Sequence, residues 1–288
     1  MTDESLETNS PLPDAGLRLY AGIDELIRTN RFTIAVVVPL VGACVLVASA
    51  EGWLPDPLAF NPMLVISGVL IMRAPLINGL VPVLSRRAFL GLGVITAYTY
   101  GIEYVGVQTG MPYGDFSYGV TLGPLIGGIP LVLPILFIPL ALNAYLLWIL
   151  VLQRIYANRA IRIGLAIATL VLMDIVLDPA AVALGFWSFA DGGGFYAVPL
   201  SNYFGWMFSA TVAILAIEYA LEPATVRTEL GRCSYLLDDL VSFVVLWGAI
   251  NAWFANWIPF IGAVILATVL VIGKHNHDSS GGRRYPGS

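Results

Sequence analysis

Apolar stretches of eighteen or more residues recur along almost the whole chain, and they restrict the folds that it can adopt. Only 11% of the residues are charged, against about 25% in soluble globular proteins. Because lipid offers backbone groups no hydrogen-bond partners, such stretches must satisfy their own hydrogen bonds as helices. The sequence therefore predicts an all-α, polytopic integral membrane helical bundle, and we expect no nucleic-acid partner.

The apolar windows divide into about eight transmembrane helices that form one domain over residues 31–273. A polar N-terminal tail, 1–30, precedes this domain, and a polar C-terminal tail, 274–288, follows it. The fourth window carries four prolines between positions 124 and 139, which predicts either a kinked helix or a short re-entrant lead-in. The expected spans are 32–50, 62–83, 88–107, 123–152, 163–186, 197–221, 237–254 and 258–273.

The basic residues favour eight crossings over seven. Thirteen of the fourteen Lys and Arg residues lie outside the apolar windows, and eight crossings place all thirteen on one side. Seven crossings would put Lys274, Arg283 and Arg284 on the opposite side. The positive-inside rule therefore places both termini in the cytoplasm. The outer loops, which contain no basic residue, are then 51–61, 108–122, 187–196 and 255–257.

Ionisable residues inside the spans are candidates for function, because each costs about 2.5–3.5 kcal/mol at a helix centre. Four such residues stand out: Arg73 in the second span, Glu103 near the outer end of the third, and Asp174 and Asp178 in the fifth. Glu218 is a weaker candidate because it lies close to the inner end of the sixth span.

The two aspartates are four residues apart and therefore share one helix face, about 6 Å from each other. Two carboxyl groups so placed in a low dielectric do not both ionise easily, so one of them should keep a proton at neutral pH and act as a general acid. The structural alternative is an ion pair between Arg73 and Asp174 or Asp178 that joins the second and fifth spans. That pair would leave Glu103 and the other aspartate unexplained.

Two outer segments combine glycines with aromatic and hydroxyl side chains. The first is TGMPYGDFSYG at 109–119, and the second is GFWSFADGGGFYAVPLSNYFGW at 185–206. One interpretation is an aromatic belt at headgroup depth. The other is a pocket in the outer half of the bundle, where both segments converge above the three buried carboxylates. Aromatic walls and acid groups suit a lipid-soluble substrate and a cationic intermediate.

Other signals are weak. His275 and His277 fall in the polar tail, and no Walker loop, dinucleotide fingerprint or zinc spacing is present. We therefore expect neither a metal site nor an organic cofactor.

The combination of Glu103, TGMPYGDFSYG at 109–119, DIVLDP at 174–179 and the segment 185–206 resembles the membrane carotenoid hydratase family. The resemblance covers roughly residues 60–260. It implies hydration of terminal double bonds in an acyclic carotenoid, which archaeal members perform on bisanhydrobacterioruberin to give bacterioruberin. Thirteen arginines against one lysine, in a chain of net charge −5, are typical of a haloarchaeal member.

Hydration of a trisubstituted alkene requires a proton donor, a shielded tertiary carbocation and an aimed water molecule. We expect Asp174 or Asp178 to be the acid and Glu103 to accept a proton from the water, or to exchange roles with the aspartates. Aromatic residues would flank the cation, and Asn202 would hold the water. The expected substrate-binding residues are Arg73, Thr109, Tyr113, Tyr118, Trp187, Asn202, Tyr203 and Trp206.

The expected partners are the polyene substrate, water and membrane lipid in the cell membrane, with association with other carotenoid-biosynthesis enzymes as a further expectation. Three other functions stay open. A membrane prenyltransferase of the lycopene elongase type would need Mg²⁺ and a diphosphate substrate. A proton-coupled transporter would need an acidic pathway to the inner face, and a carotenoid-binding accessory protein would retain its pigment unhydrated.

Overall fold

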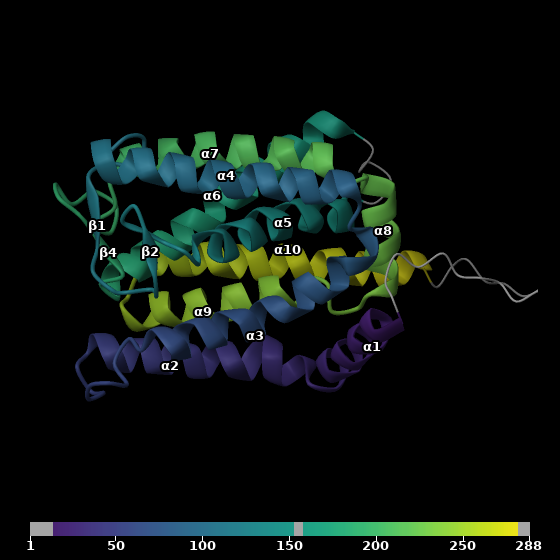
Figure 1. The fold of residues 1–288 in the computed structure, drawn as a ribbon, viewed down its shortest axis with the longest axis horizontal. Helices are drawn as coiled ribbons and strands as arrows, with labels where there is room; N and C mark the ends of the chain where they lie inside the picture. The colour runs from purple at the N-terminus through teal and green to yellow at the C-terminus, as the bar shows by residue number, and fades with distance from the viewer. Residues whose placement is uncertain (1–13, 153–157, 282–288) are drawn as a thin grey trace, which may run out of the picture.

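The computed structural model describes residues 14–152 and 158–281, and every structural statement below concerns those residues. Eight helices lie side by side in one elongated bundle (Figure 1). A π-helical turn, Thr33–Val37, leads into the first of them. The eight helices are α2 (Val38–Ala50), α3 (Pro62–Leu80), α4 (Arg86–Thr109), α5 (Leu133–Val151), α6 (Arg159–Ala183), α7 (Leu200–Ala220), α9 (Asp238–Trp253) and α10 (Trp257–Gly281).

Each of these helices coincides with one expected span to within a few residues, apart from the beginning of α5 and the end of α10. In the described chain, six helical segments are long and apolar enough to cross a membrane. The two that fall short are α4, whose apolar run is diluted by glycines, tyrosines and Glu103, and α9, which has 16 residues. A polytopic all-α membrane protein is thus supported, and the number of eight crossings stays a prediction.

The fourth expected span is only partly helical. Residues 123–132 form a tight hairpin in which β2 (Leu125–Ile126) pairs with β3 (Ile129–Pro130), and α5 begins at Leu133. Gly127 and Gly128 make the turn at φ angles of 61° and 87°, as a two-residue hairpin connection requires. Residues 123–132 are thus a non-helical lead-in to α5, while Pro139 lies inside that helix, and a re-entrant course of the lead-in stays a prediction.

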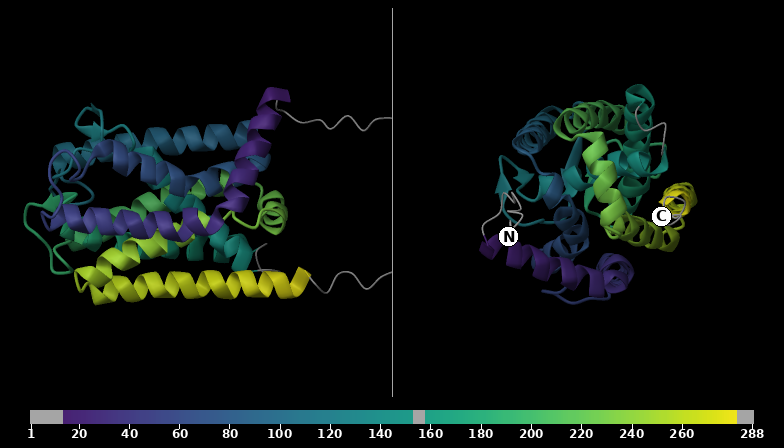
Figure 2. Two further views of the ribbon diagram at one scale, coloured as in Figure 1. Left: turned by 90° about the horizontal axis from the view of Figure 1, so that it is seen from below. Right: turned by 90° about the vertical axis from the view of Figure 1, so that its right-hand side faces the viewer.

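Two short helices lie across one end of the bundle, α1 (Asp14–Thr29) and α8 (Pro223–Arg232) (Figures 1 and 2). The sequence did not predict these two helices, because α8 is polar and α1 is amphipathic, and neither contains a long apolar run. Ile27 of α1 is nevertheless buried in the core. At the same end α10 continues to Gly281, beyond the expected boundary at 273.

The centre of the bundle is α5, which packs against α4, α6, α7 and α10. Its residues from Leu140 to Leu147 are almost completely buried, and Ala141 and Ala144 let neighbouring helices approach closely. Five of the other spans, α2, α3, α4, α7 and α10, bury one face and expose large apolar side chains on the other, as expected for helices that face lipid.

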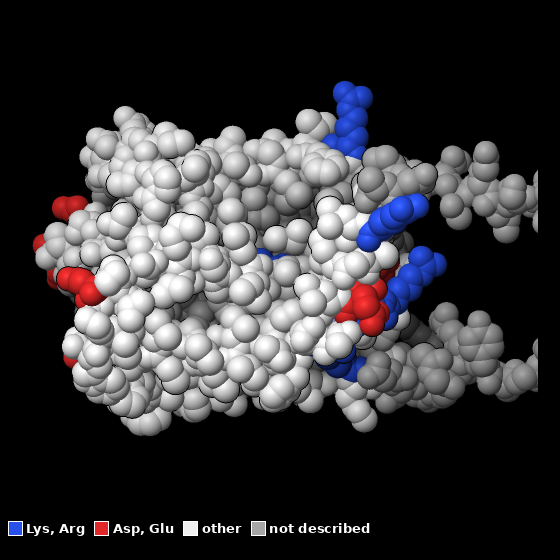
Figure 3. Space-filling view, turned by 60° about the horizontal axis from the view of Figure 1, so that its bottom comes forward, with Lys and Arg blue, Asp and Glu red and all other residues white. Residues whose placement is uncertain are grey.

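Charge is distributed unequally between the two ends (Figure 3). The basic residues of the described chain lie at the α1 and α8 end, apart from Arg73 inside the bundle. In the outer loops, every charged residue is acidic. Arg154, Arg283 and Arg284, which the topology argument also used, lie outside the described residues. Which end faces the cytoplasm stays a prediction.

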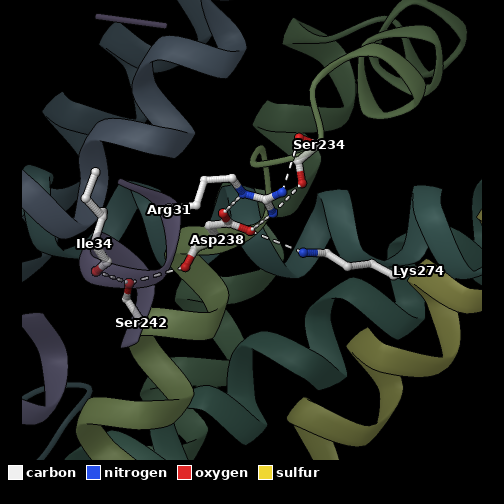
Figure 4. Close-up of polar contacts among 6 residues, drawn as sticks. All are labelled: Arg31, Ile34, Ser234, Asp238, Ser242 and Lys274. Carbon is white, nitrogen blue, oxygen red and sulfur yellow. Dashed lines mark hydrogen bonds and ion pairs between the residues drawn. The ribbon is translucent and has the colours of Figure 1, made fainter. Parts of the chain in front are cut away.

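Asp238, at the start of α9, ties three segments together at this basic end (Figure 4). Arg31 donates to both of its carboxylate oxygens, at 2.7 and 2.8 Å, and Lys274 of α10 donates to Oδ1 at 3.2 Å. Arg31 also donates to the carbonyl oxygen of Ser234 at 2.8 Å. A single carboxylate thus connects the segment before α2 with α9 and α10.

Candidate functional site

The two glycine- and aromatic-rich segments meet at the outer end of the bundle. There β1 (Phe116–Tyr118) pairs antiparallel with β4 (Trp187–Phe189), with Tyr118 opposite Trp187. The segments are so close that a Cβ atom on Gly119 would lie 2.3 Å from the carbonyl oxygen of Gly185. Only glycine fits at this crossing, which explains one of the glycines that marked the first segment.

Beneath this sheet lies a cavity of about 210 Å³ between α3, α4, α5, α6, α7 and α9. Most of its wall is aliphatic or aromatic, including Phe116, Phe186, Phe189 and Trp247, which the sequence had not singled out. The expected site residues that line it are Arg73, Glu103, Tyr113, Tyr118, Asp178, Trp187, Asn202 and Trp206.

The aspartate pair lies against one side of this cavity, and its two members are not equivalent. Asp178 lines the cavity, whereas Asp174 is completely buried behind it. The side-chain amide of Asn202 on α7 donates to Oδ2 of Asp178 and, at 3.4 Å, to Oδ2 of Asp174. Among the described residues neither carboxyl group contacts a cation, and Asp174 Oδ1 has no hydrogen-bond partner.

Glu103, on α4, reaches the same cavity and has a neutral partner too. The hydroxyl of Tyr118 in β1 donates to Oε1 of Glu103. Burial, together with the nearby Glu103, raises the pKa of Tyr118, so the phenol keeps its proton and acts as the donor. No group of three His, Cys, Asp or Glu side chains suited to a metal ion occurs within residues 14–152 and 158–281.

Tyr113 is held in place by two glycines. A Cβ atom on Gly205 of α7 would lie 2.6 Å from the ring of Tyr113, and one on Gly106 of α4 would lie 3.2 Å from it. The Tyr113 hydroxyl meets the hydroxyl of Ser209 at 2.7 Å. Ser209 was missed in the sequence because a serine in an apolar helix gives no signal of its own.

The expected ion pair between Arg73 and an aspartate of the fifth span is wrong. Arg73 instead donates to Oδ1 of Asp239, in the first turn of α9, at 2.5 Å. The amide of Asn143 donates to the other oxygen of Asp239, also at 2.5 Å. A buried arginine needs an anion, and the sequence contains three acidic candidates near the right depth. Asp239, the partner that the sequence did not reveal, lies at the predicted beginning of the seventh span.

Two further expected residues do not line the cavity. The hydroxyl of Thr109 donates to the carbonyl of Val105 at 2.7 Å and accepts from the backbone N–H of Met111 at 3.1 Å, so it shapes the end of α4. Tyr203 lies against Phe195, with ring centroids 5.8 Å apart, and its buried hydroxyl has no partner among the described residues.

The backbone around the proline after Asp178 is supported by two side chains, one on α9 and one in the loop that follows α9. Pro179 lacks the N–H that an α-helix uses at this position, and it loosens the surrounding turn. Asn251 donates to the carbonyl of Val176 at 2.7 Å, and Asn256 donates to the carbonyl of Pro179 at 3.3 Å. Side chains of α9 and of the loop after it thus fix the backbone that presents Asp178 to the cavity.

Comparison with known proteins places the chain beside a protein family and a characterised relative. The family model described as carotenoid biosynthesis protein matches residues 60–270. Bisanhydrobacterioruberin hydratase of Haloarcula japonica is 50% identical over 271 residues, which cover 93% of this chain and 92% of that protein. No solved structure matches the chain.

Proposed function

Because the chain belongs to the carotenoid biosynthesis protein family, we propose that it is a carotenoid hydratase that adds water across terminal C=C bonds of an acyclic carotenoid. The name of its Haloarcula relative supports bisanhydrobacterioruberin as the substrate and bacterioruberin as the product. The observation that carries the proposal is that Asp178 and Glu103 open onto one aromatic-lined cavity.

The size of the cavity suits one end of a long polyene. A volume of about 210 Å³ holds a branched chain end, whereas the conjugated remainder would lie among the apolar side chains outside and in lipid. An enclosed apolar wall also protects a cationic intermediate from bulk water. Tyr113, Trp187 and Trp206 line the cavity, and the faces of aromatic rings stabilise cations.

In the proposed reaction a protonated Asp178 gives its proton to the less substituted alkene carbon, and the π electrons form the new C–H bond. The tertiary cation takes an electron pair from water, and Glu103 accepts the proton that the resulting oxonium loses. Asp174 shares the Asn202 amide with Asp178, and two adjacent buried carboxyl groups favour retention of one proton. No organic cofactor takes part in these steps.

The role of Asn202 differs from the one expected from the sequence. Its amide nitrogen is committed to the two aspartates, so we assign it the orientation of the acid pair. Arg73 and Tyr118 line the same cavity and complete its polar wall.

The proposal extends to placement in the cell. We place the eight helices across the cell membrane with the α1 and α8 end in the cytoplasm and the cavity in the outer half. The substrate is then reached through lipid, and the enzyme is close to other carotenoid-biosynthesis enzymes that work on the same polyene.

Expression in a host that makes the anhydro carotenoid, followed by mass analysis of the pigments, tests the function directly. The wild-type chain should add one water for each reacting end. Asp178→Asn and Glu103→Gln should lose product, while Asp191→Asn, at an exposed carboxylate of the second outer segment, should not. Product at wild-type levels from both cavity variants would refute the site, and absence of product from the wild type would refute the function.

A further inference from the structure

Three hydroxyl groups from different parts of the chain meet in the wall of the cavity. The Ser209 hydroxyl on α7 lies 2.9 Å from the Tyr98 hydroxyl on α4 and 2.7 Å from the Tyr113 hydroxyl in the loop after α4. All three residues line the cavity, and Ser209 is 1% exposed. None of these three hydroxyl groups has a role in the proposed reaction.

The number of protons in this cluster leaves one hydroxyl free to donate. A tyrosine has an ordinary pKa of about 10, and burial raises the pKa of Tyr113 further, so the hydroxyls keep their protons near neutral pH. Three hydroxyl protons serve two hydrogen bonds. One O–H group therefore has no acceptor within the cluster.

The free proton is best assigned to Ser209. A phenol is more acidic than an aliphatic alcohol and is the better donor, while a serine oxygen has two lone pairs to accept with. Both tyrosines then donate to Ser209, and hydrogen bonds arranged in this way polarise one another and strengthen the remaining O–H donor.

Ser209 also differs from several other hydroxyl residues of the bundle helices. Thr99, Thr211 and Ser49 each donate to the backbone carbonyl four residues earlier, at 2.8 Å. Within the described chain, Ser209 makes no such bond, and both of its hydrogen bonds go to the tyrosines. Its proton is thus available to a group inside the cavity.

The position of Ser209 is fixed relative to the acid pair. Asn202, which holds the two aspartates, lies seven residues earlier on the same face of α7, about 10 Å along the helix axis. Between them Gly205 receives the ring of Tyr113. One face of α7 therefore carries Asn202, which orients the acid pair. About two turns further along the same face it carries Ser209, whose hydroxyl is a donor in a fixed position.

We propose that the free hydroxyl proton of Ser209 binds the oxygen of the water molecule that attacks the carbocation, and so holds that water against the reacting carbon. The inference rests on the proposed hydratase function. The water accepts the Ser209 bond with one lone pair, forms the C–O bond with the other and loses one proton to the cavity carboxylate. Ser209 itself is unchanged at the end of the step.

Deuterium exchange separates the capture of water from the protonation of the alkene. In D₂O the acid delivers a deuteron, and a cation that is not captured loses a hydron and returns as a deuterated anhydro carotenoid. The assay uses the full chain in detergent with the anhydro carotenoid and follows both the hydrated product and the label in recovered substrate by mass spectrometry. We expect Ser209→Ala to hydrate about tenfold more slowly, as loss of one well-placed hydrogen bond implies, with a higher ratio of exchange to hydration.

Matched variants keep the test specific. Thr99→Val removes the hydroxyl of another residue that lines the cavity, but this hydroxyl already donates to the carbonyl of Ile95. The variant should therefore leave the ratio of exchange to hydration unchanged. Tyr98→Phe and Tyr113→Phe each remove one supporting bond and should raise the ratio less than Ser209→Ala does. A Ser209→Ala variant that loses exchange and hydration in equal proportion, or loses neither, overturns the inference. A wild type that shows neither process overturns the hydratase function instead.

Discussion

Acidic residues inside the bundle have different partners at its two depths. Toward the inner end, Asp238 binds Arg31 and Lys274, Asp239 binds Arg73, and Glu218 binds Arg162 at 2.6 Å. In the outer half, Asp174 and Asp178 share the amide of Asn202, and Glu103 accepts from Tyr118. The first group meets cations, and the second meets neutral donors.

This difference separates structural acids from those suited to chemistry. A cation beside a carboxylate favours the ionised form and so prevents the carboxyl group from carrying a proton to a substrate. A neutral amide or phenol accommodates either protonation state. The inner acids therefore hold helices together, while we expect the outer acids to gain and lose a proton beside an apolar cavity.

The largest effect should follow from a change to the outer acid that lines the cavity. Asp178→Asn keeps the shape of the side chain and strands no cation, but it removes the proposed proton donor. We expect hydration to fall by about 10²–10⁴-fold, the usual contribution of a general acid, with little change in thermal stability. Pigment analysis and thermal denaturation in detergent measure the two quantities. An Asp178→Asn protein that unfolds as easily as an inner-acid variant would contradict the distinction between structural inner acids and outer acids suited to chemistry.

The opposite pattern is expected at the inner acid beside Arg73. Asp239→Asn leaves a guanidinium that is 7% exposed without its anion, which costs about 3–5 kcal/mol of stability. The melting temperature in detergent should drop sharply. The double variant Asp239→Asn with Arg73→Met removes both charges and should recover most of the loss. If the double variant is as unstable as the single one, the ion pair is not the cause.

The distinction between these acids was only partly visible in the sequence. Long apolar runs in a bilayer must form helices, because lipid offers the backbone no hydrogen-bond partners. The eight helical segments could therefore be predicted from the length and hydropathy of these runs. Asp174, Asp178 and Glu103 stood out because a carboxylate in such a run is costly. Their depth and their association with the outer segments followed from the positions of the span ends.

Partners could not be predicted in the same way. Arg73 had Asp174, Asp178 and Asp239 within its range of depth, and only the packing of α3 against α9 selects Asp239. Ser209 is an ordinary helix residue until Tyr98 and Tyr113 converge on it. Hydropathy fixes how deep a residue lies, but not which side of a helix meets which neighbour.

Glu103 should show an intermediate effect on activity. Glu103→Gln removes the proposed proton acceptor for the attacking water, yet the deprotonated Asp178 can take over that role in part. We expect hydration to fall by about 10–100-fold, less than for Asp178→Asn, with thermal stability preserved because Gln also accepts from Tyr118. Rates measured with the same carotenoid substrate rank the two variants. Equal losses at both positions would indicate that the two carboxyl groups act as one unit.

The smallest effect should occur at Asp238, where the ion pairs are partly solvated. The side chains of Arg31 and Lys274 are 36% and 35% exposed, so water screens both interactions and offers the cations an alternative partner once the carboxylate is removed. Asp238→Asn should therefore lower stability by about 1 kcal/mol or less and leave hydration unchanged. Its melting temperature, measured beside that of Asp239→Asn, compares a partly solvated with a buried ion pair on adjacent residues. Equal losses would mean that the contact with a cation, and not its burial, determines how strongly an inner acid holds the helices together.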